Sequence, residues 1–167
     1  MKKVHFTEAA LQKYPEWVMF VTSVDKDGKP NTMPAGWCMF VSGLPRLVCT
    51  AVGHTRHTHE CIARSKRFVL SWAGAGQEGL IEQTGSTSGR DVDKFEKFHI
   101  ATHPGGETGV PLIEGCAAHL ECKLHSKLSA GDHTIFVGEV VAAWLPDEPV
   151  RKLDNFNGTY AVAQPKP

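Results

Sequence analysis

Apolar residues along the chain fall mainly into short runs that predict β-strands. Residues 16–24, EWVMFVTSV, are rich in β-branched and aromatic side chains and end at the polar segment DKDGKP. Within that segment, Asp27-Gly28 is typical of a hairpin turn, because glycine accepts the positive φ that such turns require. The segment NTMPAGWCMFVS at 31–42 then predicts the returning strand.

This returning strand is interrupted by Pro34 and Gly36. Proline removes a backbone donor from the hydrogen-bond ladder, and glycine removes a side chain that would pack on the sheet. We therefore expect a bulge at this point, or a strand that lies at the edge of its sheet. An interruption of this kind lets a ligand approach the backbone closely.

Further strands and helices follow along the chain. Strands are expected at 46–52, 67–72, 117–128 and 133–145. Helices are expected at 57–65, within the Gly/Ser/Thr-rich stretch 73–90, and at 91–98, where apolar residues recur at three-residue spacing. The first hairpin and the last two strands both read as antiparallel pairs. The pattern therefore favours a β-barrel with inserted helices over a parallel βαβ sheet.

Composition indicates one ordered globular domain, 1–167. Of the 167 residues, 41% are apolar and 22% are charged, which suffices for a substantial core. The 18 basic residues balance the 18 acidic ones, so net charge gives no reason to expect a nucleic-acid or membrane partner.

The N-terminal residues and the cysteines favour a cytoplasmic protein. The stretch MKKVHFTEAALQKYPEW has no apolar run of signal-peptide length. No segment approaches the roughly 18 apolar residues of a membrane span. The five cysteines include no C-x-x-C pair. We expect reduced thiols packed as small hydrophobic side chains, in preference to a catalytic or disulfide role.

The stretch GHTRHTHECI at 53–62 raises the choice between a metal site and an anion site. On a helix, His57 and His59 point about 200° apart, and no H-E-x-x-H spacing accompanies them, so a metal site is disfavoured. Thr55 and Thr58 are both suitable N-cap residues, and Arg56 adds a guanidinium that can bind phosphate through two hydrogen bonds. Taken alone, these ten residues favour a plain capped surface helix over the anion site.

A second hydroxyl-and-arginine segment is TGSTSGRDVDKF at 84–95. Ser88 and Asp91 have the spacing of a capping box, with Asp91 in place of the usual Glu or Gln. Gly89 and Arg90 suit a turn that faces an anion. A simple helix cap is the preferred interpretation of this segment alone, but two such helix starts in one domain point to a phosphorylated ligand.

The segment AGDHTIFVGEV at 130–140 places His133 at the start of a strand, after a Gly131-Asp132 turn. A histidine there is usually an edge residue with its hydrogen bonds satisfied. The alternative is a histidine that binds a nucleotide phosphate or carries protons near neutral pH. Glu139, within an otherwise apolar strand, needs a partner or an exposed face.

Five segments, in order, resemble the flavin reductase-like family of FMN-binding split-barrel proteins, which includes the flavoredoxins. They are VTSVDKDGKPNTMPAGWCMFVS, RHTHECI, TSGRDVDKFEKF, PLIEGCAAHLEC and GDHTIFVGEVVAAW, and they run along nearly the whole chain. The resemblance implies a mainly β fold with short helices, a six-stranded antiparallel split β-barrel. It also implies a homodimer with FMN at or near the interface.

The cofactor contacts that the resemblance implies fall into four groups. They are Thr32, Pro34, Ala35, Gly36 and Trp37 along the isoalloxazine ring; the backbone of Thr50, Ala51 and Val52 at the ring or ribityl chain; Arg56 and Thr58 at the phosphate; and Ser88, Gly89 and Arg90 on the other side of the cofactor. His133 is the candidate catalytic residue, near the nicotinamide or the flavin face. No metal ligand is implied.

The function that this resemblance implies is an FMN-dependent oxidoreductase. Hydride would pass from a bound NAD(P)H to flavin N5, and electrons would pass onward to a small-molecule or protein acceptor. FAD is less favoured than FMN, because nothing in the sequence marks an adenine pocket. Two alternatives stay open: an electron carrier with tightly bound FMN, and a non-redox binding module.

The C-terminal stretch 150–167 follows the family only loosely. Tyr160 is there as a candidate contact for a ligand or partner subunit, and a plain tail is an equal alternative.

Overall fold

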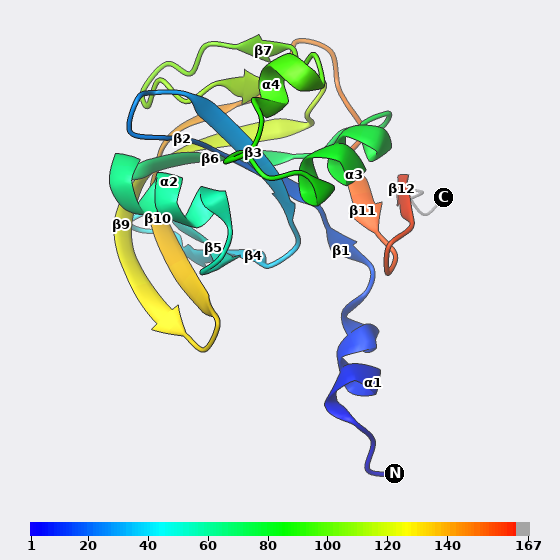
Figure 1. Ribbon diagram of the computed structural model, residues 1–167. Coiled ribbons are helices and arrows are strands. Elements are labelled where there is room, and N and C mark those ends of the chain that lie inside the picture. The colour runs from blue at the N-terminus through cyan, green and yellow to red at the C-terminus, as the bar shows by residue number, and fades with distance from the viewer. Residues whose placement is uncertain (163–167) are drawn as a thin grey trace.

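The computed structural model describes residues 1–162, and its largest element is an antiparallel sheet of seven strands (Figure 1). Along the chain, these strands are β2 (Met19–Val24), β3 (Pro30–Ala35), β4 (Cys38–Ser42), β5 (Leu47–Gly53), β6 (Arg67–Trp72), β9 (Ala118–Ala130) and β10 (His133–Trp144). They pair in the order β3-β2-β6-β9-β10-β5-β4, with every neighbouring pair antiparallel. The mainly β, antiparallel expectation is confirmed.

The two edges of this sheet are consecutive in the chain. Strands β3 and β4 are separated only by Gly36 and Trp37, so the backbone itself joins the two edges and the sheet curls into a split barrel. The expected interruption of the segment 31–42 is therefore present, and each half of it is an edge strand. The sheet has seven strands where six were expected because this one segment is divided into two.

Strand β2 is buried along its whole length, including the two polar residues Thr22 and Ser23. Successive side chains of a strand point to opposite faces. Met19 and Val21 therefore join a core cluster with Phe68 and Phe136, whereas Phe20 points to a second cluster beyond the sheet. Because both faces of the strand are covered, its sequence does not alternate between buried apolar and exposed polar residues.

Three helices gather on one side of the sheet, over β2 and β3 (Figure 1). They are α2 (His57–Ser65), α3 (Glu78–Ser86) and α4 (Lys94–Lys97). Helix α2 has the predicted bounds, and it buries Thr58, Cys61 and Ile62 against the sheet. None of the four helices in the described part of the chain is long and apolar enough to cross a membrane.

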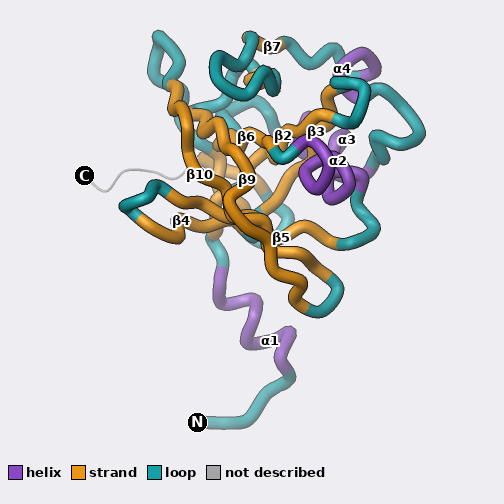
Figure 2. Tube along the Cα trace, turned by 90° about the vertical axis from the view of Figure 1, so that its left-hand side faces the viewer, coloured by secondary structure: helices purple, strands orange, loops and turns teal. Residues whose placement is uncertain are grey.

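The N-terminal segment has a different character. Helix α1 (Phe6–Ala10) and the 3-10 turn Leu11–Lys13 bury none of their residues. Two views a quarter-turn apart show this segment extending away from the barrel (Figure 2).

The C-terminal stretch is not a plain tail over 153–162. Strands β11 (Leu153–Asn155) and β12 (Tyr160–Val162) form a small sheet with β1 (Glu16–Trp17). Tyr160 packs against the second core cluster of its own chain. The stretch folds back because Leu153 is fully buried there. Residues 163–167 of the expected tail lie outside the described part.

The remaining elements include two short strands that were not predicted, whereas the cysteines and Glu139 fit the expectations. Strands β7 (Thr102–His103) and β8 (Leu112–Ile113) form a short antiparallel ladder where the sequence predicted no strand. All five cysteines are buried and free. Glu139 takes the exposed face of β10, as its position in an apolar strand required.

Candidate functional site

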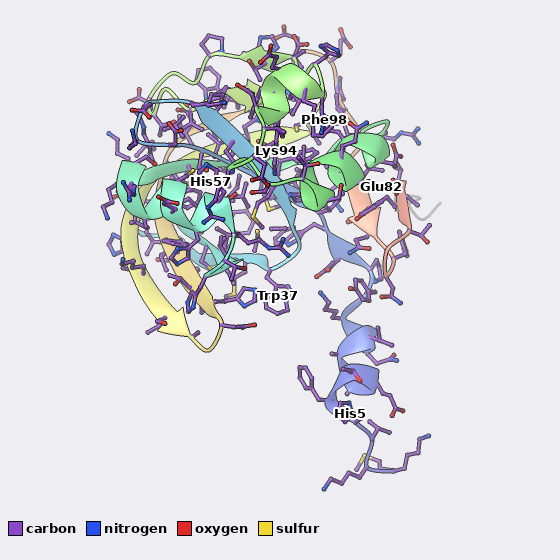
Figure 3. All side chains as sticks on the ribbon, viewed as in Figure 1. His5, Trp37, His57, Glu82, Lys94 and Phe98 are labelled. Atoms are coloured by element: carbon purple, nitrogen blue, oxygen red, sulfur yellow. The ribbon has the colours of Figure 1, made fainter. Side chains whose placement is uncertain are left out.

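Two adjoining pockets open between the edge strands and the helices. The first, here called the polar pocket, has a volume of about 390 Å³ and is lined by Asn31, Met33, Pro34, Thr55, Arg56, His57, Thr58, Thr84, Gly85, Ser86, Thr87, Ser88, Gly89 and Lys94. The second, here called the Trp37 pocket, has a volume of about 210 Å³ and is lined by Met33, Ala35, Gly36, Trp37, Ala51, Gly53, Arg56 and His133. Because Met33 and Arg56 line both, the two pockets form one groove. His57, Lys94 and Trp37 mark its extent in Figure 3.

The start of α2 forms one wall of the polar pocket. Its N-cap residue is Arg56, which has extended backbone angles and makes no side-chain capping bond within residues 1–162. The expectation that Thr55 or Thr58 caps this helix is wrong. The hydroxyl of Thr58 is buried and instead accepts a hydrogen bond from Asn31 Nδ2 at 2.8 Å. The first amides of α2 are thus left to face the pocket, with the positive end of the helix dipole.

The second predicted helix start is also capped differently. Asp93, and not Ser88, caps α4, since Asp93 Oδ1 accepts from the amides of Phe95 and Glu96 at 2.9 and 3.1 Å. Ser88 instead sits in a local turn, where its hydroxyl accepts from the amide of Arg90 at 3.2 Å. The helix begins later than the capping-box spacing implied, because Asp93 is better placed to bond two of the first free amides.

Positive charge collects in the polar pocket, although the whole chain is neutral. Arg56 and Lys94 line it, and no Asp or Glu is among its lining residues. Lys94 is 4% exposed and donates to the backbone oxygens of Thr32 and Thr84, each at 2.7 Å. Burial, and then the neighbouring Arg56, lower the pKa of Lys94 to about 8. Two cations without a carboxylate suit an anionic ligand.

Gly89 brings the loop after α3 very close to Asn31. A Cβ at position 89 would lie 2.1 Å from Asn31 Oδ1, so only glycine fits. Asn31 Oδ1 is buried and has no hydrogen-bond partner in the described part of the chain. The Thr58 hydroxyl can donate as well as accept, so a half-turn of the Asn31 amide keeps their bond and exposes an NH₂ donor. Either way, Asn31 offers the pocket an unused polar group.

The Trp37 pocket presents backbone more than side chains. Its floor is the break between β3 and β4, where the amide of Ala51 donates to Trp37 O at 2.9 Å. A Cβ on Gly36 would lie 2.5 Å from the Glu16 carboxylate, so a larger residue there would displace that side chain. Trp37 is 57% exposed, and its ring centroid lies 4.9 Å from that of His133. These two rings stand on the open side of a shallow pocket that suits a flat ligand.

Most of the residues singled out from the sequence line this groove. Those that do are Pro34, Ala35, Gly36, Trp37, Ala51, Arg56, Thr58, Ser88, Gly89 and His133. Those that do not are Thr32, Thr50, Val52 and Arg90.

The four residues outside the groove have other partners. Thr32 meets the Thr22 hydroxyl at 3.2 Å, and Thr50 accepts from Cys38 Sγ. Val52 lies in the barrel core. Alternation along β5 turns Ala51 outward when its two neighbours face the core. Arg90 donates to Thr55 O at 2.8 Å and lies outside the pocket.

Sequence reasoning missed several lining residues, above all Asn31, Met33 and Lys94. Strand alternation offered a signal for the first two, because Asn31, Met33 and Ala35 share one face of β3. Lys94 gave no such signal, since a lysine in the polar helix DVDKFEKF is expected to be solvated.

The histidines of the segment GHTRHTHECI (53–62) point to different places, as the helical spacing predicted. His57 lines the polar pocket, whereas His59 Nε2 lies 2.9 Å from the Thr134 hydroxyl. No group of three potential metal ligands occurs among residues 1–162.

Comparison with known proteins assigns the chain to a family. The model of the flavin reductase like domain matches residues 11–164. The chain belongs to the flavin reductase-like family. The resemblance of the five sequence segments is thereby confirmed.

Relatives and solved structures agree with this family. An NADH-dependent FAD reductase of Streptomyces globisporus is 38% identical over 74% of this chain and 68% of its own length. An uncharacterized protein of Archaeoglobus fulgidus is 35% identical over 68% of this chain, and the alignment spans 64% of that protein. The crystal structure of an FMN-binding protein from Thermus thermophilus, with bound 1-cyclohex-2-enone, superposes with a TM-score of 0.82 at 29% identity. It covers 100% of this chain and 96% of that one, which confirms the split-barrel fold.

Proposed function

We propose that this flavin reductase-like protein binds FMN in the groove and oxidises NAD(P)H, passing the electrons to a small-molecule or protein acceptor. The observation that carries the proposal is the shape and charge of the groove. A polar pocket with two cations and a free helix start adjoins a flat pocket lined by backbone, and Arg56 joins the two. FMN has the same division into a phosphate and a planar ring.

The residues of the polar pocket fit a phosphate monoester. The Arg56 guanidinium and the amides at the start of α2 would bind its oxygens, with the Ser88 hydroxyl from the facing loop. Asn31, whose buried amide has an unused polar atom, would bind the phosphate or the ribityl chain. FMN is proposed over FAD because no Phe, Tyr or Trp lines this pocket within the described residues to stack on an adenine.

The residues of the Trp37 pocket fit the flavin ring. Ala35, Gly36 and Ala51 would let the ring lie against the backbone, and Trp37 and His133 would flank its open side. The flavin, once bound, would supply the two-electron chemistry. The chain's own part is to bind and orient the ring, to restrict water, and to leave a side open to NAD(P)H. His133, on that side, is the proposed nicotinamide-proximal residue.

The relatives support this assignment at the level of chemistry. The Streptomyces globisporus protein is named as an NADH-dependent FAD reductase, and the Thermus thermophilus structure as an FMN-binding protein. Both names describe flavin chemistry, and one describes NADH as the donor.

Anaerobic mixing with reduced nicotinamide tests the proposed function. We expect the purified protein to take up FMN and become yellow, and NADH or NADPH to bleach the flavin absorbance within seconds. Stopped-flow absorbance spectroscopy measures this rate, with NAD⁺ as the control. Bleaching by dithionite alone would identify an electron carrier instead, and a protein that binds no flavin would contradict both functions.

We also propose a homodimer, with the groove beside the interface. Strand β4 is an edge strand with three successive exposed apolar residues, Met39 (57%), Phe40 (58%) and Val41 (45%). Next to them, Phe40, Leu47 and Val140 help to line an apolar hollow of about 470 Å³. An exposed apolar edge of this kind promotes association. Because Trp37 directly precedes β4, a second copy covering this edge would also border the Trp37 pocket.

Replacing Phe40 with aspartate is expected to convert the dimer into a monomer. The new carboxylate would have to be buried at the interface, which is unfavourable. Analytical ultracentrifugation measures the mass, and circular dichroism checks that the fold is kept. Phe156→Asp is the control, because Phe156 is an exposed aromatic residue (42% exposed) that belongs neither to β4 nor to the lining of the apolar hollow. This variant should stay dimeric. A wild-type protein that is monomeric at micromolar concentration would contradict the proposal.

The proposed location is the cytoplasm. It is supported by the five cysteines, all of which are buried as free thiols.

A further inference from the structure

Lys94 ties together the elements that form the polar pocket. It belongs to α4, and its ammonium donates to Thr32 O on β3 and to Thr84 O near the end of α3, each at 2.7 Å. Both carbonyls lack regular partners for a simple reason: β3 is an edge strand, and Thr84 lies in the last turn of its helix. One buried cation thus fixes the spacing of three pocket walls.

An ammonium has three N–H donors, and two of those of Lys94 are used by these carbonyls. Lys94 also lines the pocket on which Arg56 and the start of α2 converge. A phosphate in this pocket would therefore lie beside two cations, Arg56 and Lys94. The hydrogen-bond partners of Lys94 are neutral carbonyls, so its charge is not balanced by a carboxylate.

We propose that Lys94 couples flavin binding to proton uptake: the phosphate of the bound flavin holds Lys94 in its charged form, and binding weakens when Lys94 loses its proton. This inference rests on the proposed flavin function and deepens it. Lys94 acts as a positioning residue, because it sets the pocket walls and their charge. The step makes or breaks no covalent bond other than one N–H: one proton passes from solvent to the neutral amine.

The charges that surround Lys94 leave it as the group that titrates. Arg56, at the start of α2, is the second basic group of the polar pocket. His57, also on α2, has its pKa lowered by burial and by Arg90, so it is already neutral above pH 7. On the side of its own helix, Asp93 has its pKa lowered by the amide of Glu96 and pairs with Lys29 at 3.5 Å. Strand β3 brings no charged residue, and on α3 Glu82 is exposed.

The expected pH dependence follows from the two protonation states. Free Lys94, with a pKa of about 8, is mostly charged at pH 7 and mostly neutral at pH 9. A neighbouring phosphate dianion favours the charged form and raises the pKa. The apparent affinity is proportional to the fraction of protein in which Lys94 is charged, and this fraction falls about tenfold from pH 7 to pH 9. FMN should therefore bind about tenfold more weakly at pH 9 than at pH 7.

The experiment measures the dissociation constants of FMN and riboflavin from pH 7 to pH 9 by fluorescence titration of the full chain. Riboflavin has the same ring and ribityl chain without the phosphate, so its affinity should stay constant. Lys94→Met should bind FMN more weakly at pH 7 and with no pH dependence. Lys94→Arg, which stays charged, should also be independent of pH but bind more tightly than Lys94→Met.

Calorimetry on the wild-type protein gives a second readout that needs no variant. The heat of FMN binding at pH 8, compared in two buffers of different ionisation enthalpy, should reveal an uptake of about half a proton, since half of Lys94 is neutral at its pKa.

Three results would overturn the inference. They are an FMN affinity that stays constant from pH 7 to pH 9, a riboflavin affinity that falls as steeply as that of FMN, and an undiminished proton uptake in Lys94→Met. Failure of the proposed function looks different, because the protein would then bind neither flavin at pH 7, which refutes the function and the inference together.

Discussion

Replacing Arg56 with alanine is expected to weaken FMN binding by about 10- to 100-fold. Arg56 borders both pockets and would provide the bidentate hydrogen bonds to the phosphate. A hydrogen bond to a charged group contributes about 1.5–3 kcal/mol, and each 1.4 kcal/mol is a factor of ten in affinity. Fluorescence titration with FMN measures the change.

Arg64→Ala is the matched control for this prediction. Arg64 lies near the other end of α2, where it pairs with Glu60 at 3.3 Å and is exposed. Its removal should leave FMN affinity within a factor of two, because exposed ion pairs contribute little. Equal affinity of Arg56→Ala and wild type would reject the phosphate assignment.

The largest expected effect on stability comes from Glu121, a carboxylate that is fully buried on β9. It accepts hydrogen bonds from the amides of Gly106, Glu107 and Thr108, from the Thr108 hydroxyl, and from Trp144 Nε1. These donors hold the loop before β8 against the central sheet. These hydrogen bonds compensate for the cost of burying the carboxylate, and they anchor a loop that has little regular structure.

Glu121→Ala is expected to lower the free energy of unfolding by about 3–5 kcal/mol, because it leaves the buried amide and hydroxyl of Thr108, and three partly buried donors, without their acceptor. Urea denaturation at pH 7, followed by tryptophan fluorescence, measures the change. Glu139→Ala, at an exposed position on the neighbouring strand β10, should change stability by about 0.5 kcal/mol or less. Similar losses for both variants would contradict the anchoring role of Glu121.

The contribution of Glu121 should also depend on pH. Burial alone would raise the pKa of this carboxyl, but the hydrogen bonds from Thr108, Trp144 and Gly106 outweigh it and lower the pKa below its usual value. A depressed folded pKa means that the stabilisation is present above the ordinary glutamate pKa of about 4.3 and is lost as the pH falls through the folded value. The difference in stability between wild type and Glu121→Ala should therefore shrink at pH 3.

The strand pattern could be predicted because the residue types within each strand indicate by themselves that the strand is buried. The β-branched and aromatic residues of β2 favour a strand by themselves, and the turn at Asp27-Gly28, whose glycine has φ of +82°, also depends on neighbours in sequence. Pro34 and Gly36 likewise predicted the interruption and the edge strands, because a missing backbone donor and a missing side chain are local properties of the sequence. Helix α2 was predicted with its observed bounds for the same reason.

The helix caps and the C-terminal strands could not be predicted in this way. Thr58 has the right chemistry for a cap, but Asn31, 27 residues earlier in the chain, occupies its hydroxyl. The segment of β11 and β12 gave no strand signal, because β11 pairs with β1 and Leu153 and Tyr160 pack in the second core cluster, whose other members lie far away in sequence. Competition between local and distant partners decided each case.

Sequence alone thus determined the family, the antiparallel pattern of strands, and the arginine and broken strand that border the groove. Only the tertiary structure decided which residues face it. Strand alternation turned Thr50 and Val52 inward and left Ala51 outward, and the packing of α4 on β3 buried Lys94 beside Arg56. The physical reason is that a side chain's charge and partners depend on burial. Burial is set by elements that meet in space, which for Lys94 are β3 and α3.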